Sequence, residues 1–177
     1  YNSSLYYILC SFFEFCSLFY NFDKTIISKA GNFKKKYEPS KKDFYNLKEF
    51  KKFIKYVDNE VYKQFFNLMF FTVTRPGEAM ALKFSDLQGD YICITKTISE
   101  HGKREVGTPK SSSSVRKIKI DKFLKNDLLK LKKYYNNLYH QLDYDYFIFG
   151  GMKPLAPTTI NRYKLKACQK ANLRPIT

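Results

Sequence analysis

Hydrophobic positions fall into separate blocks along the chain. Residues 5–22 are apolar on nearly every side, which is typical of a helix packed between neighbours. Apolar residues then recur at helical spacing over residues 44–57 and again over 60–72, which predicts two further helices. Asp43 is a candidate cap for the first of these two. The intervening segment 31–42 is polar, basic and interrupted by a proline, as in a linker between domains.

The pattern changes after residue 72. Pro76 fixes its own φ angle and lacks an N–H, so it favours the first turn of a short helix that continues to Asp86. Alternating and β-branched residues then predict a small three-stranded antiparallel sheet. Its expected strands are residues 90–100, 104–110 and 114–120. The turn between the second and third strands is polar and rich in serine.

Two more helices are predicted in the last third of the chain. Asp121 is the expected N-cap of the first, whose apolar positions are three or four residues apart. The expected buried residues of this helix are Phe123, Leu124, Leu128, Leu131, Tyr135 and Leu138. After a short extended segment over residues 143–149, Pro157 favours the first turn of a last helix within residues 154–173. The expected core residues of the last helix are Ile160, Leu165, Ala167 and Ala171. The whole pattern predicts an α+β fold that is mostly helical.

The net charge of the chain indicates what kind of partner it binds. The chain has 32 Lys and Arg against 16 Asp and Glu, a formal net charge of +16. An excess of this size indicates a polyanionic partner, most simply a nucleic acid. Lysine far outnumbers arginine, so the codon bias of an AT-rich genome is the alternative explanation of the charge.

The sequence shows no pattern for a metal site or a disulfide framework. Its four cysteines form no C-x-x-C pair, and only two histidines could join them. Free thiols in a reducing cytoplasm are therefore expected. The apolar run 5–20 is shorter than a bilayer span, contains Glu14 and lacks a basic flank and a cleavage site, so we expect no membrane role.

One arginine lies in apolar surroundings, where burial of its charged side chain would be unfavourable. In residues 72–87, TVTRPGEAMALKFSDL, Arg75 follows a strongly apolar helix and precedes another. An arginine at such a place needs an anion to meet it. A planar guanidinium can bind two oxygens of a phosphate at once, which makes a phosphodiester a candidate. A salt bridge to Glu78 or Asp86 is the alternative.

Three motifs in order carry a family resemblance. The first is Thr-x-x-Arg-x-x-Glu in TVTRPGEAMALKFSD, the second is TPKSSSSVRKI between predicted strands, and the third is PLAPTTINRYKLKACQKANLRPI. This order resembles the catalytic domain of the tyrosine recombinases, the phage-type and transposon-type integrases. Four positions depart from the family pattern. They are Val73 for glycine, Phe84 for tryptophan, Ala156 for serine and Asn172 for glycine.

The resemblance implies a reaction and roles for three residues. Enzymes of this family cut DNA by transesterification through a phosphotyrosyl intermediate, without metal or another cofactor. By position, Arg75 would stabilise the phosphate, Glu78 would orient Arg75, and Lys110 would give a proton to the leaving 5′-oxygen. The family's His-x-x-Arg box and tyrosine nucleophile would follow Ile176 and Thr177, so none of the fifteen tyrosines here is the expected nucleophile.

The resemblance also implies a domain organisation and a DNA-binding surface. Residues 1–30 would end a core-binding domain, residues 31–42 would be a basic linker, and residues 43–177 would begin the catalytic domain. The partner would be double-stranded DNA, on which the complete protein would form multimers. The expected DNA contacts are Lys83, Lys103, Arg104, Arg116, Thr158, Thr159, Asn161, Arg162 and Lys164.

Two other functions remain open from the sequence. The chain could be a remnant of the same fold that binds DNA without cutting it. It could also be an unrelated basic helical module that binds RNA or a protein, in which case strands over residues 90–120 would not be expected.

Overall fold

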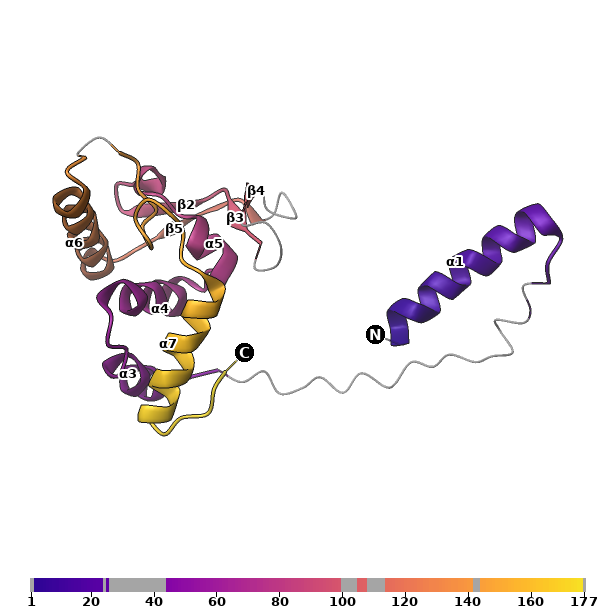
Figure 1. Cartoon of the computed structure of the whole chain (residues 1–177), viewed down its shortest axis with the longest axis horizontal. Coiled ribbons are helices and arrows are strands. Elements are labelled where there is room, and N and C mark those ends of the chain that lie inside the picture. Colours follow the sequence, from indigo (N-terminus) through magenta and orange to yellow (C-terminus); the bar gives the residue numbers. More distant parts are fainter. Residues whose placement is uncertain are drawn as a thin grey trace. The chain divides into compact units, whose positions relative to one another are not determined.

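The computed structural model describes residues 2–23, 25, 44–99, 105–107, 114–141 and 144–176 (Figure 1). The chain divides into two units, Tyr1–Asp43 and Phe44–Thr177, which are described in turn. The predicted linker, residues 31–42, lies outside the described residues.

The first unit is built on one long helix, α1 (Asn2–Tyr20), which confirms the helix predicted there. Many of its apolar side chains, among them Ile8, Phe12 and Leu18, are exposed in this unit. In the described part of the chain, no helix combines the length and the apolarity needed to cross a membrane.

The second unit begins with two helices whose starts are set by asparagine caps. Helix α3 spans Leu47–Lys55, and Asn46 accepts the Glu49 N–H at 2.9 Å while Glu49 accepts the Asn46 N–H at 2.9 Å. The cap is therefore Asn46, and the helix starts later than a cap at Asp43 would allow. Helix α4 spans Glu60–Thr72, as predicted, and Asn59 accepts the Val61 N–H at 3.0 Å.

Helix α5 spans Pro76–Ala81 and is shorter than predicted. Leu82 is extended, and its carbonyl accepts the Ile148 N–H at 2.8 Å, so the chain leaves the helix there to pair with a distant segment. A separate 3-10 helix, Phe84–Asp86, follows. The predicted helix to Asp86 is therefore two elements, because a tertiary hydrogen bond takes the Leu82 carbonyl.

A three-stranded antiparallel sheet is confirmed, with different strands from those predicted. Its order is β1 (Leu87–Gln88), β2 (Tyr91–Ile94) and β5 (Arg116–Lys119). A second sheet pairs β3 (Thr97–Ile98) with β4 (Val106–Gly107). The predicted strand 90–100 is thus split between the two sheets, with a break at Lys96, whose Nζ lies 2.9 Å from Asp86.

The last two helices are α6 (Lys122–Tyr139) and α7 (Pro157–Lys170). Asp121 caps α6 by accepting the Leu124 N–H at 2.7 Å, and Pro157 starts α7, as predicted.

Three core predictions in these helices are wrong. Phe123, Leu138 and Leu165 are exposed. On α6 the buried stripe includes Asp127, which accepts a hydrogen bond from the buried Gln64 at 3.3 Å, so the stripe is rotated away from Phe123. On α7, Cys168 is buried beside Ala167, and the inward face passes through these residues instead of Leu165.

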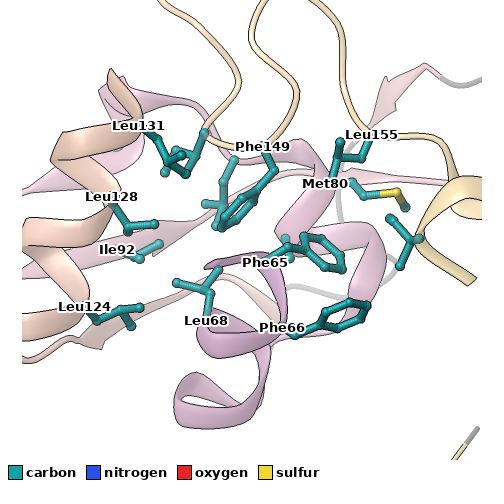
Figure 2. Close-up of a cluster of buried hydrophobic side chains, with 14 of the residues drawn as sticks. Phe65, Phe66, Leu68, Met80, Ile92, Leu124, Leu128, Leu131, Phe149 and Leu155 are labelled. Atoms are coloured by element: carbon teal, nitrogen blue, oxygen red, sulfur yellow. The ribbon is translucent and has the colours of Figure 1, made fainter. Parts of the chain in front are cut away.

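Helix α4 runs through the centre of the core (Figure 2). Phe65 and Leu68 of α4 are fully buried, with Leu128 of α6 and Ile92 of β2 in the same cluster. The Phe149 ring meets the Phe65 ring edge-on, with centroids 5.3 Å apart. Burial on this scale contributes roughly 2 kcal/mol for each large side chain, so the end of α4 is held firmly.

The end of α4 is strained. Val73 has φ 54° and ψ 32°, the left-handed region, and donates its backbone N–H to the Met69 carbonyl. A β-branched residue is rarely found there, because its Cβ approaches the following carbonyl. Val73, at a position where the tyrosine recombinases that the sequence resembles usually have glycine, therefore has an energetic cost here.

Helix α5 lies directly against strand β3, and Gly77 makes this close approach possible. A Cβ added at Gly77 would lie 2.5 Å from the Ile98 carbonyl oxygen and 2.8 Å from the Thr97 hydroxyl oxygen. There is no space for a side chain at this contact.

We expect Val73→Gly to stabilise the chain by about 1 kcal/mol, because glycine relieves the left-handed strain. The measurement is thermal or urea unfolding of the two proteins. The matched control is Val115→Gly, at an exposed valine that is not among the described residues with positive φ, and this change should lower stability. An unchanged or lower stability of Val73→Gly would contradict the strain at this turn.

We expect Gly77→Ala to cost about 1–3 kcal/mol, because the new methyl group would push α5 away from β3. Urea unfolding measures this loss. Gly107→Ala is the control, since a Cβ at Gly107 would meet no described atom within 4 Å. Equal stability of the two variants would mean that the contact between α5 and β3 is looser than the structure shows.

Candidate active site

The turn between α4 and α5 presents Arg75 to solvent. Thr74 before it is buried, and its hydroxyl hydrogen-bonds the Thr72 hydroxyl, which also contacts the Leu68 carbonyl at 2.6 Å. Pro76 after it starts α5. Between these two fixed neighbours, the Arg75 side chain is 74% exposed. The backbone here is therefore rigid while the guanidinium remains open to an external anion.

Glu78, one turn into α5, is the buried acid of the site. Its Oε2 accepts the Arg75 backbone N–H at 3.0 Å and Nη2 of Arg116 at 2.8 Å. Its Oε1 accepts Nη1 of Arg116 at 3.1 Å and, at a longer 3.4 Å, Nη1 of Arg75. Arg116 therefore makes a bidentate ion pair with Glu78, whereas the Arg75 guanidinium makes only one long contact with Glu78.

These partners keep Glu78 ionised. Burial alone would raise its pKa, but the hydrogen bonds from Arg116 and from the Arg75 backbone outweigh burial, so the pKa of Glu78 is lowered below its usual range. The hydrogen bonds between Arg116 and Glu78 also raise the pKa of Arg116. At neutral pH, Glu78 is thus a fixed negative charge and not a proton donor.

Arg116 lies on strand β5, in register with Ile94 of β2. Along β5, Arg116 and Ile118 are half-buried, whereas Lys117 and Lys119 are exposed. The role of Arg116 beside Glu78 was not predicted from the sequence. The signal for it was the alternation of the strand, which places Arg116 on the same inward side as Ile118.

Three residues predicted in the site, Lys103, Arg104 and Lys110, lie outside the described residues. The described parts of the chain next to them lie close to α5. Strand β3 touches Gly77, and the Ser114 carbonyl accepts Nη1 of Arg116 at 3.1 Å.

Two of the lysines predicted to bind DNA already have partners in the structure. Nζ of Lys83 lies 3.9 Å from Oδ2 of Asp145 and 5.1 Å from the centre of the Phe147 ring. Nζ of Lys164 donates to the Ile176 carbonyl at 3.0 Å.

The start of α7 is more open to a partner. Thr158, Asn161 and Arg162 are exposed, and Thr159 is half-buried. The Arg162 guanidinium carbon lies 5.9 Å from the centre of the Tyr163 ring. Exposed hydroxyl, amide and guanidinium groups in the first turns of a helix are suited to contact phosphate oxygens.

An apolar groove of about 850 Å³ brings the first and third motifs together. Val73 and Pro76, on either side of Arg75, line it together with Thr158, Asn161 and Lys164 of α7. Aromatic residues of α3 and α4 form much of its wall. Pro76 of the first motif and Thr158 of the third are more than eighty residues apart in the sequence, and both line this groove.

The described residues contain no group of three His, Cys, Asp or Glu side chains that could hold a metal ion. All four cysteines are unpaired, and Cys93 and Cys168 are buried.

No family model matches the sequence. The ICEBs1 integrase of Bacillus subtilis (strain 168) is 30% identical to it over 148 residues, which span 77% of this chain and 40% of the integrase. The chain thus spans less than half the length of the curated relative that it matches.

Solved structures share the fold at low sequence identity. A dimer of λ integrase residues 75–356 bound to a COC′ core site has a TM-score of 0.62 at 16% identity, and the match covers 96% of this chain and 55% of that chain. Residues 82–397 of the Tn1549 transposon integrase, in complex with transposon right end DNA, have a TM-score of 0.59 at 16% identity, and the match covers 75% of this chain and 47% of that chain. XerA recombinase has a TM-score of 0.53 at 17% identity, and the match covers 96% of this chain and 62% of the XerA chain. In sequence the chain is thus similar to an integrase, and its fold is that of the tyrosine recombinases.

Proposed function

We propose that this chain is part of an enzyme that cuts and rejoins double-stranded DNA at specific sites. The observation that carries the proposal is Arg75, a cation fixed by its backbone and open to solvent, in a chain with the fold of a recombinase. The net charge of +16 favours binding to a polyanion.

In the proposed reaction, a tyrosine hydroxyl oxygen attacks the scissile phosphorus. The bond from phosphorus to the 5′-oxygen breaks, which leaves a 3′-phosphotyrosyl link and a free 5′-hydroxyl. Attack of another 5′-hydroxyl reverses the step and restores the DNA backbone, so the bond energy is conserved. The family pattern assigns the nucleophile to none of the tyrosines in this chain.

Arg75 would stabilise the negative charge that develops on the non-bridging phosphate oxygens. Its planar guanidinium can donate to two oxygens, and its exposed side chain can reach a phosphate without first breaking a strong ion pair. Lys110 would donate the proton that the leaving 5′-oxygen requires. Glu78 would hold the turn through the Arg75 backbone and take no part in proton transfer.

DNA contacts away from the scissile phosphate would come from two regions. One is the start of α7, where Thr158, Asn161 and Arg162 are exposed. The other is the segment with Lys103 and Arg104. Thr159, Lys83 and Lys164 are less accessible, and the two lysines would have to exchange their present partners for phosphate.

The proposed organisation follows the division of the chain into two units. Helix α1 would end a core-binding domain, residues 31–42 would link the domains, and the unit from residue 44 would be the first part of the catalytic domain. The complete protein would form multimers on DNA. It would act in the cytoplasm, where the unpaired cysteines would remain reduced.

The test is Arg75→Lys in the full-length protein. Lysine keeps the charge but cannot donate to two oxygens in one plane, so cleavage should fall by about 10²–10³-fold. Binding of the same DNA should change much less. Trapping of the covalent protein–DNA adduct on a nicked substrate measures cleavage, and fluorescence anisotropy measures binding.

The matched control is Arg174→Lys, at an arginine that pairs with Glu49 at 3.0 Å and is not among the proposed DNA contacts, and this change should leave both cleavage and binding nearly unchanged. Equal losses of cleavage and binding in Arg75→Lys would show that Arg75 only grips the DNA backbone. An absence of covalent adduct in the unsubstituted full-length protein would favour a DNA-binding remnant of the fold.

A further inference from the structure

We propose that Arg116 is a positioning residue that neutralises Glu78 and so keeps Arg75 free to bind a phosphodiester. The inference rests on the proposed function, because it assigns Arg75 to phosphate. It replaces the expectation from the sequence that Arg116 contacts DNA directly.

The contacts at the Glu78 carboxylate show how its negative charge is shared. Arg116 donates one hydrogen bond to each carboxylate oxygen, at 2.8 and 3.1 Å. The Arg75 guanidinium reaches only Oε1, at 3.4 Å. In the described part of the chain, these two arginines are the cations that contact Glu78. The shorter, two-pronged geometry makes Arg116 the main counter-ion.

Exposure distinguishes the two arginines in the same way. The Arg116 side chain is 33% exposed and that of Arg75 is 74% exposed. The ion pair of Glu78 with Arg116 is neutral overall, so the charge of Arg75 remains available to an anion from solvent. If Arg116 were absent, the buried Glu78 would need another cation, and Arg75, three residues away, is in contact with it already.

Arg116 has a second contact that ties the site together. Its Nη1 also donates to the Ser114 carbonyl at 3.1 Å. Ser114 is four residues after Lys110. Arg116 therefore joins the backbone at Ser114 to the helix that begins after Arg75.

The inference predicts an exchange of partners that a double-mutant cycle can detect without DNA. In the unsubstituted chain, Arg75→Ala should shift Tm very little, since the Arg75 contact is long and exposed. In an Arg116→Gln background, the same change should lower Tm by about 2–4 °C, because Arg75 has become the counter-ion of Glu78. Equal effects of Arg75→Ala in both backgrounds would overturn the inference.

A second arm of the experiment uses DNA. The probe is a labelled duplex of mixed sequence, and the readout is the dependence of the binding constant on salt concentration. In Arg116→Gln, we expect Glu78 to bind Arg75, so that one phosphate contact is lost. The magnitude of the slope of log K against log salt concentration should then fall by about 0.9. Adding Glu78→Gln to Arg116→Gln should restore the slope of the unsubstituted chain, because nothing then captures Arg75.

A direct phosphate contact by Arg116 makes the opposite prediction. The slope would then stay low in the double variant Glu78→Gln/Arg116→Gln, and this result would overturn the inference. Lys133→Gln, at an exposed lysine of α6 remote in sequence from the site, serves as the control for a general change in charge.

The single variant Arg116→Gln leaves the buried Glu78 carboxylate without its main partner, so this variant could fail to fold. The comparison then moves to Glu78→Gln/Arg116→Gln with and without Arg75→Ala. We expect Arg75→Ala to lower the salt slope of the double variant by about 0.9, and an unchanged slope would overturn the inference. If no variant binds DNA while the Tm coupling is observed, the proposed function fails and the partner exchange stands.

Discussion

The buried carboxylate of Glu78 is the interaction on which the organisation of the site depends. It accepts the Arg75 backbone N–H and both prongs of the Arg116 guanidinium, so it joins the turn after α4 to strand β5. A buried charge is tolerated only when its hydrogen-bonding capacity is filled, and here each oxygen has a close donor. The aromatic core around α4 supplies the second constraint, because it fixes the helix end from which Arg75 projects.

Local signals in the sequence were sufficient for most of the helices. The bounds of α4, the proline start of α5 and the Asp121 cap of α6 were predicted, because each depends on residues within one turn of helix. The buried faces and the strand pairing were less predictable. Phe123 is exposed while Asp127 is buried and accepts a hydrogen bond from the distant Gln64, and no local spacing encodes that partner.

The site shows the same division between local and tertiary information. The motif around Arg75 predicted an arginine at a helix junction, where its burial would be costly. The structure has the arginine at that junction, but its side chain is 74% exposed, so it avoids the cost of burial. The ion pair of Glu78 with Arg116 joins residues 38 positions apart, so it depends on how β5 is brought to α5. Val73 is a related case. Its place in the motif marks a departure from the family pattern, but only the backbone angles show that the departure places a valine in a left-handed conformation.

The close approach of Gly77 to the Ile98 carbonyl has a mechanical consequence. With no side chain between them, helix and ribbon have no soft layer that could absorb a displacement. A displacement of strand β3 is therefore transmitted to the first turn of α5, which begins directly after Arg75.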